Sequence, residues 1–244
     1  MWFSTRFSPL DLSQTDWLLL WSYHDNHDPT KENTSISFTG WKQIFEGQVG
    51  YKFKSEYLTN EKTPNSVTSI NRLNFNQTLQ TFINDFYSAH GLTVQNIHPS
   101  KVSLLLGIND IVSSSNWLGV TLGRGGINQG ISVSLVFVGK ISSIHSTQKA
   151  LYVDDVVLHE LGHARGLNAT NMSGGTEPHD HTNHLNYDAE NNTTQEDNKC
   201  VMRSGEVPVS PYVFCGYHQS ILKKCLKSEI LTTYNPNSVC ATFP

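Results

Sequence analysis

The chain has 244 residues, of which 37% are hydrophobic, and its 17 basic and 21 acidic residues give a formal net charge of -4. This composition suits one large globular domain or two lobes, and the absence of a Lys/Arg-rich block argues against nucleic acid as a partner. The apolar run Trp17–Trp21 is far shorter than the roughly 20 residues of a membrane span, so we expect none.

The N-terminal residues contain no recognisable signal. They lack the basic start and the apolar stretch of a secretory leader. Only 16% of all residues are charged while Asn, Ser and Thr are abundant, which is more usual outside cells. We therefore expect a secreted or cell-surface protein whose signal is not part of this chain, with a cytoplasmic location as the alternative. Residues 1–65 mix aromatic clusters with turn-rich stretches, and we set them apart as an extension of unknown role from a domain over 66–244.

The first clear element is an amphipathic helix that begins near Asn74 and ends before Gly91. Its apolar residues recur at helical intervals, and they are Phe75, Leu79, Phe82, Ile83, Phe86 and Tyr87. Extended segments follow, and the last of them alternates apolar and polar residues at its start. They are Lys101–Ile108, Trp117–Leu122 and Gly130–Val138.

A second helix is predicted over Ala150–Arg165, with Gly166 as its left-handed terminator. We expect Asp154 and Asp155, in its first turns, to complement the helix dipole. The chain from Gly166 to about residue 217 is dense in His, Asn, Gly and Pro and is predicted to be loop. A terminal helix is expected over Tyr217–Ile230.

The second helix carries the sequence VVLHELGHARG. Residues four apart on a helix lie one above the other, with about 5–6 Å between their Cβ atoms, so His159 and His163 can direct their imidazoles at one ion. Glu160 is rotated by one residue from the first ligand, which puts its carboxylate beside the metal, where it can take a proton from metal-bound water. Peptide hydrolysis assisted by a metal requires this arrangement.

HELGHARG, followed downstream by Cys200-Val201-Met202, resembles the metzincin superfamily of zinc peptidases, and within it the archaemetzincin-like proteins. The resemblance implies an α+β fold. A twisted mixed sheet with two main helices forms an upper lobe (66–166), an irregular, cysteine-containing lower lobe follows (167–244), and the active-site cleft lies between them. It also implies one catalytic Zn²⁺, with Met202 in the turn beneath the metal.

The expected activity is that of a zinc endopeptidase, with Glu160 as general base. The substrate is a protein or peptide that lies extended along an exposed edge strand, Gly130–Val138 or a neighbour. We expect the enzyme to act as a monomer.

The third metal ligand departs from the metzincin pattern, because Ala169 stands where the third histidine is expected. The segment Glu177–Asp188 reads EPHDHTNHLNYD and supplies three candidates. The resemblance places the third histidine a short way upstream of the Cys-x-Met turn. In order of preference, the candidates are His184, His181 and His179.

The cysteines all lie near the C-terminus, at Cys200, Cys215, Cys225 and Cys240. Two disulfides, Cys200–Cys215 and Cys225–Cys240, are favoured over the other connectivities because their loops are shorter. The resemblance also allows a second zinc at Cys200, Cys215 and His218. That set is incomplete, since Leu185 occupies the place of a further cysteine.

Other interpretations remain open. Tyr212 is a candidate to stabilise the developing oxyanion, as a Tyr in this region does in some metzincins, or else a packing residue. An aspzincin-type peptidase would use Asp180 as a ligand. A zinc-containing binding or toxin-like module would keep the fold without efficient cleavage, but a purely structural zinc site has no need of Glu160. A structural protein with a fortuitous motif would bind no zinc.

Overall fold

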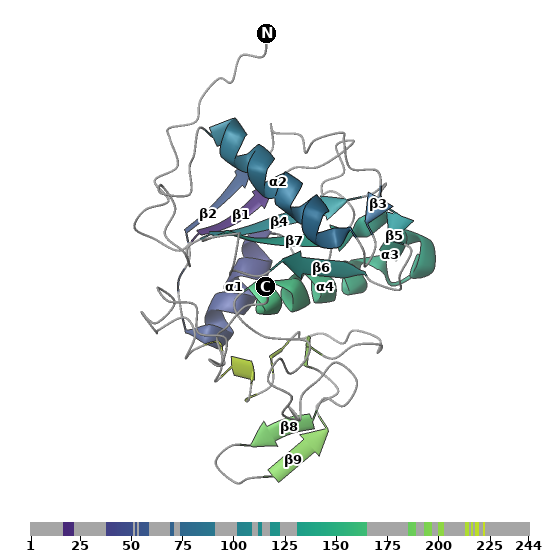
Figure 1. Cartoon of the computed structure of the whole chain (residues 1–244). Helices are drawn as coiled ribbons and strands as arrows, with labels where there is room; N and C mark the ends of the chain where they lie inside the picture. Colours follow the sequence, from purple (N-terminus) through teal and green to yellow (C-terminus); the bar gives the residue numbers. More distant parts are fainter. Residues whose placement is uncertain are drawn as a thin grey trace.

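The structure is a computed structural model. It describes residues 17–21, 38–50, 52, 54–58, 69–70, 74–90, 102–108, 112–113, 118–122, 131–164, 185–188, 193–196, 200–202, 213–214, 216, 218–219 and 222. In these residues a β-sheet is covered by helix α2 on one face and by helices α1 and α4 on the other (Figure 1).

The main sheet has five strands in the order β2-β1-β4-β7-β6. Four strands, β2, β1, β4 and β7, run parallel to one another, whereas β6 pairs antiparallel with β7 and ends the order. The strands are β1 (Trp17–Trp21), β2 (Lys54–Leu58), β4 (Val102–Ile108), β6 (Gly119–Leu122) and β7 (Ile131–Phe137). Two small sheets pair β3 (Ser69–Ile70) with β5 (Val112–Ser113) and β8 (Leu185–Asp188) with β9 (Thr193–Glu196).

The three strands predicted from the sequence are confirmed as β4, β6 and β7. Two of the other strands, β1 and β2, come from the first 65 residues, and β1 pairs with β4 over its whole length. The expected boundary at residue 65 therefore cuts through one continuous sheet. The apolar run Trp17–Trp21 was too short to be distinguished as strand or helix by its periodicity.

Strand β7 lies inside the sheet, between β4 and β6. Its described side chains from Ser132 to Phe137 are all buried, because helices cover both faces of the sheet at this strand. The expectation that Gly130–Val138 is an edge strand is wrong. Its neighbour β6 occupies the end of the strand order.

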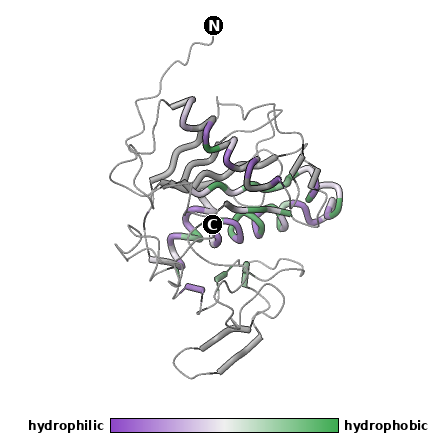
Figure 2. Tube along the Cα trace, viewed as in Figure 1, coloured by the Kyte–Doolittle hydropathy of each residue, from purple (hydrophilic) through white to green (hydrophobic). Residues whose placement is uncertain are grey.

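The helices are α1 (Phe38–Val49), α2 (Phe75–His90), α3 (Val138–Ile144) and α4 (Lys149–Ala164). Helices α2 and α4 confirm the two predicted from the sequence, and Ile83 of the predicted apolar stripe of α2 is fully buried while Asn84 is exposed. In Figure 2 hydrophobic and hydrophilic residues alternate along α4, as expected for a helix with one face on the sheet. None of the helices in the described ranges is long and apolar enough to cross a membrane.

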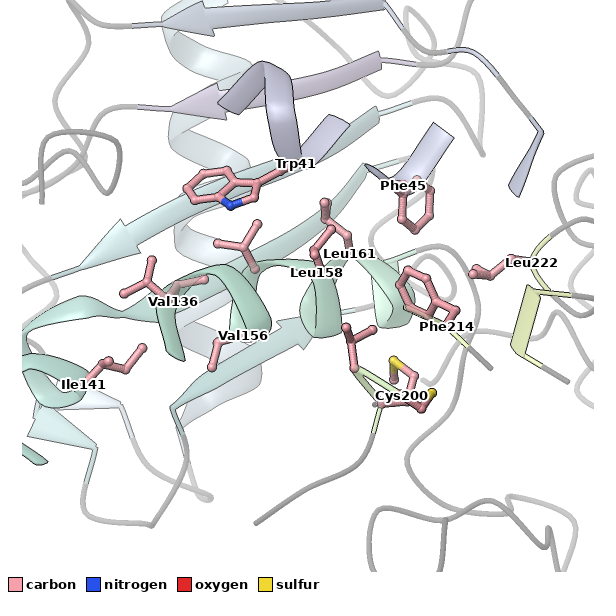
Figure 3. Close-up of a cluster of buried hydrophobic side chains, with 14 of the residues drawn as sticks. Trp41, Phe45, Val136, Ile141, Val156, Leu158, Leu161, Cys200, Phe214 and Leu222 are labelled. Carbon is pink, nitrogen blue, oxygen red and sulfur yellow. The ribbon is translucent and has the colours of Figure 1, made fainter. Parts of the chain in front are cut away.

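Helix α1 was not predicted. It packs on α4 through Trp41 and Phe45, four residues apart, which face Leu158 and Leu161 of α4 (Figure 3). The helix ends at Gly50, whose φ of 65° is the left-handed conformation that glycine adopts without strain, and whose N–H donates to the carbonyl of Glu46. The four-residue spacing of Trp41 and Phe45 thus places both on the buried face of α1 that packs against α4.

A buried hydrogen bond joins α1 to α4. The indole Nε1 of Trp41 donates to Oδ1 of Asp154 over 2.7 Å, and both side chains have no exposed surface. Asp154 is the sixth residue of α4, beyond its first turn. The expectation that Asp154 complements the helix dipole is therefore wrong, and its carboxylate instead ties the two helices together.

Replacing Trp41 with phenylalanine is expected to lower the free energy of unfolding by about 1–3 kcal/mol, because a buried carboxylate loses a donor. Urea unfolding of the wild type and the Trp41→Phe variant measures this. The exposed neighbour Gln43, replaced by alanine, is the control and should change stability by less than about 0.5 kcal/mol. Equal losses in both variants would contradict a role for the buried bond.

Candidate metal centre

His159 and His163 lie on consecutive turns of α4 and converge. Their Nε2 atoms are 3.1 Å apart, and their rings are nearly perpendicular, at 82° with centroids 4.7 Å apart. Two nitrogens that bind one tetrahedral zinc at about 2.0–2.1 Å are separated by about 3.3 Å. The pair therefore has the spacing of two ligands of a zinc-sized ion. Both side chains are half-buried, so a solvent-borne ion can reach them.

The orientation of His159 is set by a residue far along the chain. Its Nδ1 lies 2.7 Å from the backbone carbonyl oxygen of Val201. A carbonyl only accepts, so Nδ1 carries the proton and the lone pair of this tautomer is on Nε2, the atom that faces His163. A hydrogen bond of this kind typically orients a metal-binding histidine.

The segment 200–202 is itself fixed by contacts with Val213, further along the chain. The N–H of Val201 donates to the carbonyl of Val213 over 2.8 Å, and Cys200 forms an isolated bridge with the same residue. Met202 is 2% exposed and belongs to the core cluster that also contains Leu158 and Leu161. The Cys-Val-Met sequence therefore packs against the helix that carries the histidine pair, with Val201 as the direct contact.

Glu160 is buried against the edge of the sheet. Only 4% of its surface is exposed, and its Oε2 accepts a hydrogen bond from the hydroxyl of Thr121 on β6. Ser134 of β7 lies 2.8 Å from the same hydroxyl. The carboxylate thus lies on the β6 side of α4, next in sequence to the first histidine.

Burial raises the pKa of Glu160 to about 8, and the hydrogen bond from Thr121 opposes this rise in part. A carboxyl with a pKa near neutrality is suited to accept and return a proton. A divalent cation held by the neighbouring histidines would favour the ionised form of this group.

Cys200 is a buried thiol in the structure, and its Sγ lies 3.4 Å from Nδ1 of His218, which is also buried. The structure therefore brings together two of the three groups considered for a second zinc. Among the described residues no disulfide involves Cys200. The proposed partner Cys215 lies outside the described residues, as do Cys225 and Cys240, so the pairing of those cysteines stays a prediction.

The candidates for a third ligand are not described by the structure. His179, His181 and His184 lie outside the described ranges, and so do Asp180 and Tyr212. Within those ranges no three His, Cys, Asp or Glu side chains are grouped so that they could hold an ion. The described part of the site is thus a pair of converging histidines, with Glu160 next to the first of them in sequence.

The contributions of Thr121, Ser134 and the Val201 carbonyl were missed by sequence reasoning. The only available signal was that polar residues interrupt two apolar strands, at Thr121 in GVTL and at Ser132 and Ser134 in ISVSLVF. A buried hydroxyl needs a hydrogen-bond partner, and such positions therefore mark the face of a sheet that meets a polar group.

No protein-family model matches the sequence, and no curated protein matches it either. What the chain does is therefore inferred from its own residues and their geometry.

Proposed function

We propose that this protein is a zinc-dependent endopeptidase of the metzincin type. The observation that carries the proposal is the convergence of the His159 and His163 Nε2 atoms at 3.1 Å on helix α4, which also carries the buried carboxylate of Glu160. Two imidazoles that converge on one ion, with a carboxylate next in sequence to the first, are the residue types that metal-assisted hydrolysis needs. For the third ligand we retain His184, then His181 and His179.

The fold supports the same proposal. Four parallel strands and an antiparallel strand β6 form a mixed sheet, and β6 lies directly beside α4. The strand at the end of the order has backbone groups with which an extended peptide can pair. We therefore assign substrate binding to β6, in place of the interior strand β7.

A bound zinc ion would polarise the scissile carbonyl and lower the pKa of water. Glu160 would take the proton of the attacking water and later transfer it to the leaving amine. His159, fixed by Val201, and His163 would hold the ion, while Met202 would fill the core beneath them. Tyr212 is retained as the candidate that stabilises the oxyanion.

Zinc content and peptide hydrolysis test this proposal together. The purified protein should bind one zinc per chain at the catalytic site and cleave a peptide mixture at internal bonds, as seen by mass spectrometry. A chelator should stop cleavage, and added zinc should restore it. The His163→Ala variant should bind zinc at least about 100-fold more weakly, because even residues that only orient ligands contribute about 10–100-fold.

His145 provides the matched control. It is a half-buried histidine that stacks on Tyr152, with centroids 3.6 Å apart, and it is not part of the converging pair. His145→Ala should therefore keep zinc and activity. Zinc affinity that is equal in His163→Ala and the wild type would refute the metal site. A wild type that binds zinc and cleaves nothing would refute the peptidase and favour the binding module.

A further inference from the structure

We propose that Thr121 is a positioning residue for Glu160. Its hydroxyl anchors Oε2 of the carboxylate and so holds the general base in one position on α4. This inference rests on the proposed function, since it assigns a role within the same site. It extends the site from α4 to the edge strand β6.

A continuous series of hydrogen-bond contacts runs from strand β7, inside the sheet, to the carboxylate of Glu160. Thr121 pairs directly with Ser134 in the antiparallel register of β6 and β7, and their hydroxyl oxygens are 2.8 Å apart. Thr121 in turn contacts Oε2 of Glu160. Both hydroxyls also lie near the backbone carbonyl of Glu160, at 3.2 Å for Thr121 and 3.3 Å for Ser134.

The number of hydroxyl protons decides the direction in which these hydrogen bonds are donated. When Glu160 is ionised its carboxylate can only accept, and each hydroxyl donates once, so Thr121 then donates to Oε2 of Glu160. Ser134 then donates either to Thr121, at 2.8 Å, or to the Glu160 carbonyl, at 3.3 Å. The shorter contact is favoured, so Ser134 supports the oxygen of the hydroxyl that anchors Glu160.

Gly119 explains how the carboxylate can approach the strand. It lies two residues before Thr121 and therefore on the same face of β6. A Cβ atom at this position would lie 2.5 Å from Oε1 of Glu160, 2.8 Å from its Cγ and 2.8 Å from Cγ1 of Val156. Only glycine leaves this space open. The side chain of Glu160 is thus fixed through Oε2, while Oε1 lies over Gly119.

The functional consequence follows from geometry. A general base must stay within hydrogen-bond reach of the proton that it removes, and a displacement of about 1 Å can cost about 100-fold in rate. Strand β6 would pair with the peptide along its edge and hold the base through Thr121. The base and the scissile bond would then be aligned by the same strand.

The first test measures the contact itself in the metal-free protein. A double-mutant cycle combines Thr121→Val, which removes the hydroxyl, with Glu160→Met, which removes the acceptor. We expect the unfolding equilibrium constant of the double variant to differ by about 5-fold or more from the value obtained by combining the single changes. Simple additivity would overturn the proposed contact.

The second test measures its effect on the zinc-loaded enzyme. Thr121→Val should lower kcat by about 10–100-fold with little change in KM or zinc affinity, because only the orientation of the base is altered. Thr121→Ser keeps the hydroxyl and should recover most of the rate. Thr81 is the control, since its hydroxyl caps a backbone carbonyl on helix α2, and Thr81→Val should leave kcat unchanged.

The outcomes separate this inference from the proposed function. If the wild type cleaves and Thr121→Val cleaves at the same rate, or if serine gives no recovery, the positioning role is wrong and the peptidase assignment stands. If the wild type binds zinc without cleaving, the peptidase assignment is wrong and the positioning role falls with it.

Discussion

The Glu160→Gln variant is expected to lose peptide hydrolysis while it retains zinc. Glutamine has nearly the same shape, so it fits the space between Gly119 and Thr121, but its amide cannot take a proton from water. General bases typically contribute about 10²–10⁴-fold to the rate, and we expect kcat to fall by a factor in this range. The two histidines that bind the ion are unchanged.

The measurement is kcat on a peptide that the wild type cleaves, together with the zinc content of both proteins. Equal zinc in the two proteins is required before the rates are compared, because a loss of metal would itself abolish activity. A variant that binds zinc and cleaves within about threefold of the wild-type rate would exclude Glu160 as the general base, since general bases contribute at least about 10²-fold.

The metal-free protein is expected to lose stability as the pH rises from about 4.5 to about 8. Burial raises the pKa of Glu160 from 4.5 to about 8 in the folded state. Between these values the carboxyl is protonated in the folded protein and ionised in the unfolded chain, so the unfolded state binds fewer protons and a rise in pH favours it. The stabilisation is fully present below about pH 4.5 and is lost above about pH 8.

The size of this effect is several kcal/mol, because each unit of pKa difference corresponds to about 1.4 kcal/mol. Urea unfolding at pH 5, 6, 7 and 8 should be measured for the metal-free wild type and for Glu160→Gln. Glutamine does not titrate, so the difference between the two curves isolates Glu160. Parallel curves would contradict a raised pKa. Bound zinc should flatten the wild-type curve, because a cation nearby favours the carboxylate.

The elements with a clear internal period were predictable from the sequence. Helix α2 has apolar residues at helical spacing with Gly91 after its end, and β7 combines alternation with a continuous apolar stretch. Both signals depend only on neighbours along the chain. Helix α1 lacked such a signal, because Gly40 and Gly47 lower its helix propensity and its aromatic residues find their partners on α4, more than 100 positions away.

The sequence alone determined the spacing of the candidate site. A separation of four residues brings His159 and His163 to the same side of a helix, whatever the rest of the chain does. Glu160, which follows His159, lies on the adjoining side. The tertiary structure decided what surrounds them. The Val201 carbonyl that orients His159 is 42 positions away, and the Thr121 hydroxyl that meets Glu160 is 39 positions away. Contacts of this range depend on strand order and helix packing, and no local periodicity encodes them. The same packing puts β6, and not β7, at the end of the strand order within the described residues.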